Sequence, residues 1–257
     1  EDKLNEWSLI DSSGYSLPHT PNGPLVLDEL IRSQNDLNSQ RYQAYVQDNM
    51  AWKTQDSSEW DLNAGIRAHH WTFTSQTVFS PRVQLAFRPN WNDTSLDSTE
   101  MKRNVIFKLA TGLYYQPAFY REMRDLNGQV NEGIEAQRSM HVVMGMDILI
   151  NMFGRPFRLI TDAYYKYYSE LIPYEIDNVR LRYYARNNSV GRAYGIDTKL
   201  TGEFLPGVQS WANLSYLKTE ENLLDDFYIL TNNEGNETRV EPGFIPRPTD
   251  QRINFSM

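Results

Sequence analysis

Apolar residues recur at every second position along most of this chain. In residues 61–68 the even positions, from Leu62 to Ala68, are apolar, while the odd positions are polar, charged or glycine. The same alternation runs through residues 82–88, 157–166, 194–204 and 211–216. Because successive side chains of a strand point to opposite faces, each segment is predicted to be a strand with one apolar and one polar face.

The alternation predicts about ten strands, and helical periodicity is weak throughout. The expected strands are 4–15, 39–53, 59–72, 79–89, 104–116, 139–152, 157–169, 191–204, 209–220 and 250–257. Long connections (16–38, 117–138, 170–190 and 221–249) alternate with short ones (54–58, 154–156 and 205–208). The connections 74–78 and 90–103 break this scheme. Long loops at one end and short turns at the other are typical of an outer-membrane barrel, so the long ones are predicted to lie outside the cell.

The parity of each strand predicts which side chains contact lipid and which face the lumen. Aromatic residues such as Trp52, Trp71 and Tyr115 gather at strand ends, as in the girdles at a membrane–water boundary. The residues predicted to face the lumen are Arg67, Asp162, Lys166, Asp197 and Lys199. Those predicted to face lipid are Leu62, Ala64, Ile66, Val83, Leu85, Phe87, Val142, Met144, Leu159, Ala163, Ile196, Leu200, Ala212 and Leu214.

Composition narrows the classes of function. The 257 residues carry a formal net charge of −8, which argues against a nucleic-acid partner because phosphate binding needs a basic surface. Cys is absent, so disulfides, thiol nucleophiles and Cys-ligated metals are excluded. No stretch of about 20 apolar residues is present, as a membrane-spanning helix would require.

Several segments resemble the barrel of TonB-dependent outer-membrane receptors, particularly those of Bacteroidetes type. One is the strand 61–67, which ends in glycine and arginine, and another is the strand start Ser80-Pro81-Arg82. Residues 111–122 are similar to the glycine–aromatic–proline exit into a large outer loop. The strand at Gly195 and Asp197 has Asp where the family commonly has Glu. The resemblance covers nearly the whole chain.

This resemblance implies an all-β, antiparallel transmembrane barrel of about 22 strands with a plugged lumen. Residues 1–257 are then expected to be a partial barrel domain, from the C-terminal half, without counterparts of the plug domain and the TonB box. The implied location is the outer membrane of a Gram-negative bacterium. The implied partners are outer-membrane lipid, the remainder of the barrel and its plug, and periplasmic TonB through the plug region, with a surface lipoprotein as a further candidate.

The function that follows is active uptake of a scarce ligand such as a siderophore, a glycan or a peptide. Two alternatives remain at this stage: a passive outer-membrane pore or barrel scaffold of an envelope complex, and a soluble secreted β-sheet protein that binds carbohydrate. A plug and TonB box upstream of Glu1 would separate the first alternative from uptake. Solubility without detergent would favour the second.

No catalytic, metal or cofactor site is predicted, and the chain is not expected to be an enzyme. His69 and His70 are adjacent and point to opposite faces of a strand, so they cannot share one metal. Glu122 and Asp125 are interpreted as solvated loop charge rather than as an acid–base pair. The residues predicted to contact a ligand lie in the outer loops and are Tyr120, Arg124, Arg182 and Tyr183.

Overall fold

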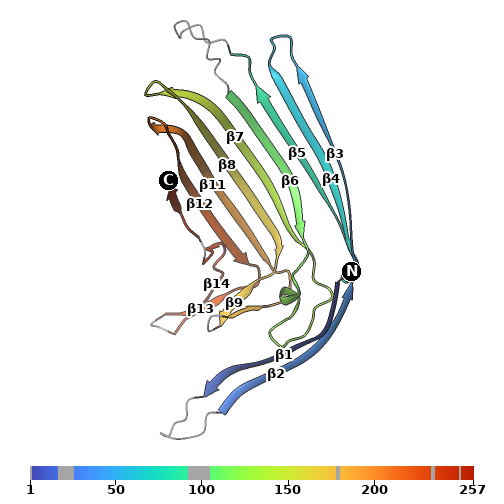
Figure 1. The fold of residues 1–257 in the computed structure, drawn as a ribbon. Helices are drawn as coiled ribbons and strands as arrows, with labels where there is room; N and C mark the ends of the chain where they lie inside the picture. The colour runs from blue at the N-terminus through green and yellow to red at the C-terminus, as the bar shows by residue number, and fades with distance from the viewer. Residues whose placement is uncertain (1, 17–25, 92–104, 178–179, 233–234, 249) are drawn as a thin grey trace.

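The computed structural model describes residues 2–16, 26–91, 105–177, 180–232, 235–248 and 250–257, and these residues form antiparallel β-strands almost throughout (Figure 1). The largest unit is an open ten-stranded sheet with the order β15-β12-β11-β8-β7-β6-β5-β4-β3, in which β16 also pairs with β12. Its strands are β3 (Arg41–Lys53), β4 (Glu59–Trp71), β5 (Gln76–Arg88), β6 (Val105–Gln116), β7 (Gln137–Met152), β8 (Arg155–Leu171), β11 (Ser189–Leu205), β12 (Val208–Leu223), β15 (Ile245–Pro246) and β16 (Ile253–Ser256).

Three further hairpins stand outside this sheet. They are β1 (Asp2–Ser16) with β2 (Val26–Ser39), β9 (Tyr174–Asp177) with β10 (Arg180–Tyr183), and β13 (Tyr228–Thr231) with β14 (Glu237–Val240). A short 3-10 helix, η1 (Tyr120–Met123), follows β6. No helix among the described residues is long and apolar enough to cross a membrane.

The prediction that the strand 4–15 belongs to the same sheet as the others is wrong. That segment is β1, and it pairs with β2, which occupies most of the predicted connection 16–38. The edge of the ten-stranded sheet is β3 instead. Residues 26–39 escaped the alternation test because Asp28, Glu29 and the run 32–36 interrupt their apolar positions. The other predicted strands all have counterparts in the sheet, and its antiparallel all-β character is confirmed.

The register confirms that the residues predicted to face lipid share one face of the sheet. Residues directly opposite each other in neighbouring strands point to the same side. One row across the sheet reads Met50, Leu62, Leu85, Leu109, Met144, Ala163, Ile196, Tyr216 and Ile253. We call this side the outward face. Arg67, Asp162, Lys166, Asp197 and Lys199 have the opposite parity and lie on the other side, which we call the polar face.

The apolar band of the outward face runs obliquely to the strands. The row through Ala64 and Val83 is apolar in β4 and β5 but reaches the charged Lys218 in β12. A horizontal band of lipid contact drifts in this way when strands are tilted by about 35–45° from the membrane normal. Asp48, in edge strand β3, is a carboxylate inside this band, and it accepts a hydrogen bond from the Asn49 backbone N–H (2.9 Å).

The connections divide between the two ends of the sheet as predicted. The β1–β2 hairpin, the segment 117–136, the β9–β10 hairpin and the segment 224–252 lie at one end, the lower end in Figure 1. Short turns lie at the other end, where Gly154 (φ 71°) and Gly207 (φ 76°) adopt the left-handed backbone that two tight hairpins require. The exceptional connection 90–103 leaves β5 at the short-turn end, and residues 92–103 are outside the described residues.

Candidate functional site

The connections at the long-loop end pack together around a small apolar core. We call this unit the loop assembly; it comprises the segment 117–136, the β9–β10 hairpin and the adjoining ends of β2, β4 and β8. Met123, in η1, is fully buried at its centre. The other buried members of the cluster are Leu37, Trp71, Ala118, Ile134, Ile172 and Tyr183. Because this core draws on segments far apart in the sequence, it fixes the loops relative to one another and to the sheet.

Glu122 lies at the edge of this core. Its carboxylate accepts hydrogen bonds from the Phe119 backbone N–H (2.8 Å) and from Gln137 Nε2 (3.3 Å). Burial raises the pKa of Glu122, with partial compensation from the Phe119 N–H and from Arg121. The solvated loop charge expected from the sequence is therefore wrong for Glu122, because tertiary packing removes its carboxyl from water.

Side-chain amides join the segments of the loop assembly to one another. Asn131 Nδ2 donates to the Ala185 carbonyl (2.7 Å), while Asn187 Nδ2 donates to the carbonyls of Glu170 (2.7 Å) and Glu135 (3.1 Å). The Glu135 backbone N–H returns a hydrogen bond to Asn187 Oδ1 (2.7 Å). These bonds satisfy backbone groups that loops cannot pair in a ladder, so the connections form a defined structure.

The structure brings the four residues predicted to contact a ligand into this one assembly. Tyr183 belongs to the buried cluster, and Tyr120 packs against it. Arg182 donates from Nη2 to the Leu126 carbonyl (3.1 Å), and its Nη1 lies 3.8 Å from a Glu175 carboxylate oxygen. Arg124 is half-buried, and burial lowers its pKa. Tyr120, Arg182 and Tyr183 thus help to hold the loops together, and Arg124 is half-buried at the end of η1.

Two arginines with exposed side chains lie at this site, Arg121 and Arg186, and neither is among the four residues predicted to contact a ligand. The Arg121 guanidinium carbon lies 5.6 Å from the Tyr183 ring centroid, and that of Arg186 lies 5.6 Å from the Tyr184 ring centroid. Arg121 directly follows Tyr120, and Arg186 lies two residues after Tyr184, which is the sequence signal for them. Their exposure became apparent only from the packing of Tyr183 and its neighbours.

The polar face carries an ion-paired cluster and a pair of like charges. Asp147 accepts two hydrogen bonds from the Arg158 guanidinium (2.9 and 2.6 Å) and lies 3.6 Å from Lys108 Nζ. Asp162 and Asp197 are directly opposite each other on neighbouring strands. Such a surface is suited to contact with water or with a polar protein segment, in contrast to the outward face.

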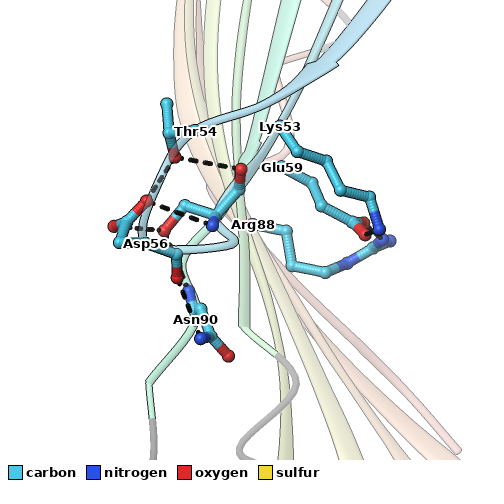
Figure 2. A network of polar contacts seen from close by, with 7 residues as sticks. Lys53, Thr54, Asp56, Glu59, Arg88 and Asn90 are labelled. Atoms are coloured by element: carbon cyan, nitrogen blue, oxygen red, sulfur yellow. Dashed lines mark hydrogen bonds and ion pairs between the residues drawn. The ribbon is translucent and has the colours of Figure 1, made fainter.

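A second polar network closes the short-turn end of the sheet (Figure 2). In the turn after β3, the Asp56 carboxylate accepts hydrogen bonds from Thr54 Oγ1, Ser58 Oγ (2.8 Å) and the Ser58 backbone N–H (3.2 Å). The bond from Thr54 is the largest cause of a lowered Asp56 pKa. Asn90 donates from Nδ2 to the Asp56 carbonyl (2.9 Å) and from its backbone N–H to Ser58 Oγ (3.1 Å), which ties this turn to the chain leaving β5.

The described residues contain no group of three or more His, Asp or Glu side chains arranged to hold a metal ion. His69 and His70 do lie on opposite faces of β4, since His70 is directly opposite Thr77 and bonds to its hydroxyl (2.9 Å) whereas His69 is opposite Val78. The two imidazoles thus belong to opposite sides of the sheet, as their adjacency in the sequence predicts.

The antiparallel sheet has an exposed apolar face, a polar face with ion pairs, and long connections gathered at one end. These three features together are typical of the wall of an outer-membrane barrel. The model of the TonB dependent receptor-like β-barrel family matches residues 3–249, and the chain belongs to this family. The family comprises receptors and transporters of the Gram-negative outer membrane, which contain a plug and interact with TonB. Searches of curated proteins and of solved structures each found no match to the chain.

Proposed function

We propose that this chain is the C-terminal-half wall of a Bacteroidetes-type TonB-dependent receptor that takes up a scarce ligand actively. Membership of the family supports a role in outer-membrane transport. The polar face would then surround the plug, and the loop assembly would form part of the outer mouth. Energy would reach the receptor through periplasmic TonB and the plug region.

The observation that carries this proposal is the packed loop assembly. A passive pore needs only that its loops leave the channel open, whereas a receptor needs loops held in one arrangement, because ordering them on binding would cost affinity. Here the fully buried Met123, the buried Tyr183 and the amide bonds of Asn131 and Asn187 hold the connections before any ligand arrives. The outer mouth is thus preorganised.

Direct ligand contact is assigned to exposed arginines above this framework. Arg121 and Arg186 present guanidinium groups beside aromatic rings, a combination that suits anionic chelates, sugars and peptide carboxylates. Tyr120, Arg124, Arg182 and Tyr183 support these two residues and contact the ligand where their edges reach the surface.

The test is uptake by cells that carry the intact receptor. A deletion strain would be complemented with wild type, with Arg121→Ala, with Arg186→Ala, or with Arg155→Ala at the short-turn end as a matched control. Radiolabelled ferric siderophores, oligosaccharides and peptides are the probes. We expect one class to accumulate in a way that a protonophore abolishes, with slower uptake in the two loop variants only.

Two outcomes would contradict the proposal. Accumulation that a protonophore and loss of TonB leave unchanged would identify a passive pore. If the complemented strain accumulated no probe, active uptake would be refuted. If the deletion strain also assembled its other envelope proteins normally, a scaffolding role would be refuted as well.

A surface lipoprotein is the partner that we propose at the long-loop end. Apolar side chains are exposed there on two hairpins, Ile176 and Leu181 on β9–β10 and Tyr228 and Leu230 on β13–β14. Exposed apolar side chains on such hairpins would be covered by a protein partner. Co-purification of a lipoprotein with wild type, and its loss from the double variant Tyr228→Ser and Leu230→Ser, would support this partner.

A further inference from the structure

The outward face has a shallow depression where β7, β8, β11 and β12 run side by side. Its floor is the small, exposed side chain of Ala163, which is opposite Met144 on one side and Ile196 on the other. The rings of Tyr165 and Tyr194 stack along one rim with their centroids 6.3 Å apart. Tyr216 closes the far side. The depression is thus lined by apolar and aromatic side chains and extends across four adjacent strands. Such a surface suits an acyl chain.

Cationic side chains lie directly beyond this rim, toward the long-loop end. Lys218 is opposite Tyr194, and its Nζ lies 5.8 Å from the centroid of that ring. Arg192 is one row further along the outward face. Both cations contact the buried Glu220, at 2.6 Å each. Arg138, also outward and exposed, lies beyond them on β7.

The charges of this cluster do not cancel. Glu220 balances one of its two partners, so Arg192, Lys218 and Glu220 together leave one positive charge, and Arg138 adds a second. Arg138 is held by a hydrogen bond from Nε to Ser169 Oγ (2.8 Å), which leaves the rest of its guanidinium to face solvent or a ligand. On the outward face this charge borders the apolar band, at the depth where lipid headgroups begin.

We propose that the depression and the cations above it form one binding site for an anionic, phosphate-bearing lipid of the outer leaflet. The acyl chain lies over Ala163 between Met144 and the tyrosines, the phosphate is bound by Lys218 and Arg192, and Arg138, two strands away from Arg192, adds positive charge at the same end. Selectivity for such a lipid requires both parts of the site. The cations alone would bind any anion, and the depression alone would accept the acyl chain of any lipid. The site rests on the orientation of the outward face toward lipid and is independent of which ligand the receptor transports.

The test measures lipid selectivity of the intact receptor. The receptor would be reconstituted in phosphatidylcholine bilayers with trace spin-labelled phosphatidylglycerol or phosphatidylcholine, both labelled at the same acyl position. The immobilised fraction gives the relative association constant of the two lipids. Lys218→Gln removes a cation but leaves Arg192 to pair with Glu220, and Ala163→Leu fills the groove without changing charge.

Matched controls use the same substitutions elsewhere. Lys199→Gln removes a lysine from the polar face, and Ala64→Leu enlarges an outward alanine on β4, far from the cations. We expect wild type to prefer phosphatidylglycerol, Lys218→Gln to lower that preference about fivefold, and Ala163→Leu to lower it as well. Both controls should match wild type.

Three results would overturn the site. Wild type with no preference for phosphatidylglycerol would remove it altogether. Equal effects of Lys218→Gln and Lys199→Gln would show a general charge effect. Displacement by inorganic phosphate with Ala163→Leu unchanged would show a site for a free anion and not for lipid. Uptake assays read out none of these, so failure of the lipid site and failure of active transport are distinguishable.

Discussion

The strongest test of the outward face is a charge placed in its middle. Leu109, on β6, is 45% exposed and lies directly opposite Leu85 and Met144. If this face contacts lipid, Leu109→Arg places a guanidinium near the centre of the apolar band. An arginine at that depth on a barrel costs about 2–4 kcal/mol, because hydrocarbon cannot solvate the charge. This corresponds to about a 30- to 700-fold change in the folding equilibrium.

Two controls separate depth from the charge itself. Gln84→Arg places the same side chain on the polar face of β5, where water or protein solvates it. Thr77→Arg keeps the outward face but moves to the long-loop end of β5, where the expected cost is about 0–1 kcal/mol. The three variants of the intact receptor would be titrated with urea in phospholipid vesicles, with the folded fraction followed by heat-modifiable gel migration. A Gln84→Arg variant as unstable as Leu109→Arg would refute the assignment of the faces.

Three further predictions concern the ends of the sheet. On intact cells, Asn127→Cys should react with an impermeant maleimide and Gln55→Cys should not, and the reverse would invert the topology; both positions are exposed, and the absence of native Cys leaves no background. Met123→Ala should reduce the local stability of the loop assembly by about 2–5 kcal/mol, seen as faster hydrogen exchange in 117–136 with β5 unchanged. The raised pKa of Glu122 means that its stabilising contribution is present below the ordinary Glu range and is lost as pH rises through the folded-state value. Glu122→Gln should therefore flatten the pH dependence of the protection factors in 117–136, and an unchanged dependence would contradict this role of the carboxyl.

The choice of residues for cysteine labelling depends on side-chain exposure, which only the structure gives. Ser189 would be a natural choice from the sequence, since it lies in a predicted outer loop. In the structure it begins β11, is 1% exposed, and donates its hydroxyl to Glu221 Oε1 (2.9 Å). A cysteine there would react poorly on either side of the membrane, so Asn127 is the informative position.

The sequence by itself determined the strands of the sheet and the chemistry of its two faces. Side-chain orientation in a strand is local, because each residue points opposite to its neighbour whatever the partner strand is. The parity of Leu62, Val83, Met144 and Ile196 therefore predicted a shared face before any pairing was known, and the register agreed. The short turns after β3, β7 and β11 likewise followed from where the alternation stops.

Only the tertiary structure decided how the long connections pack and what the outward face can bind. Leu37, Met123 and Tyr183 meet in one core although long stretches of sequence separate them, and no periodicity in a loop records such contacts. The sequence pattern also did not predict that β1 pairs with β2. This pairing depends on backbone hydrogen bonds between the two strands, and the apolar positions of β2 do not alternate strictly. The depression at Ala163 depends on which side chains the register places around a small residue, and that information exists only once neighbouring strands are aligned.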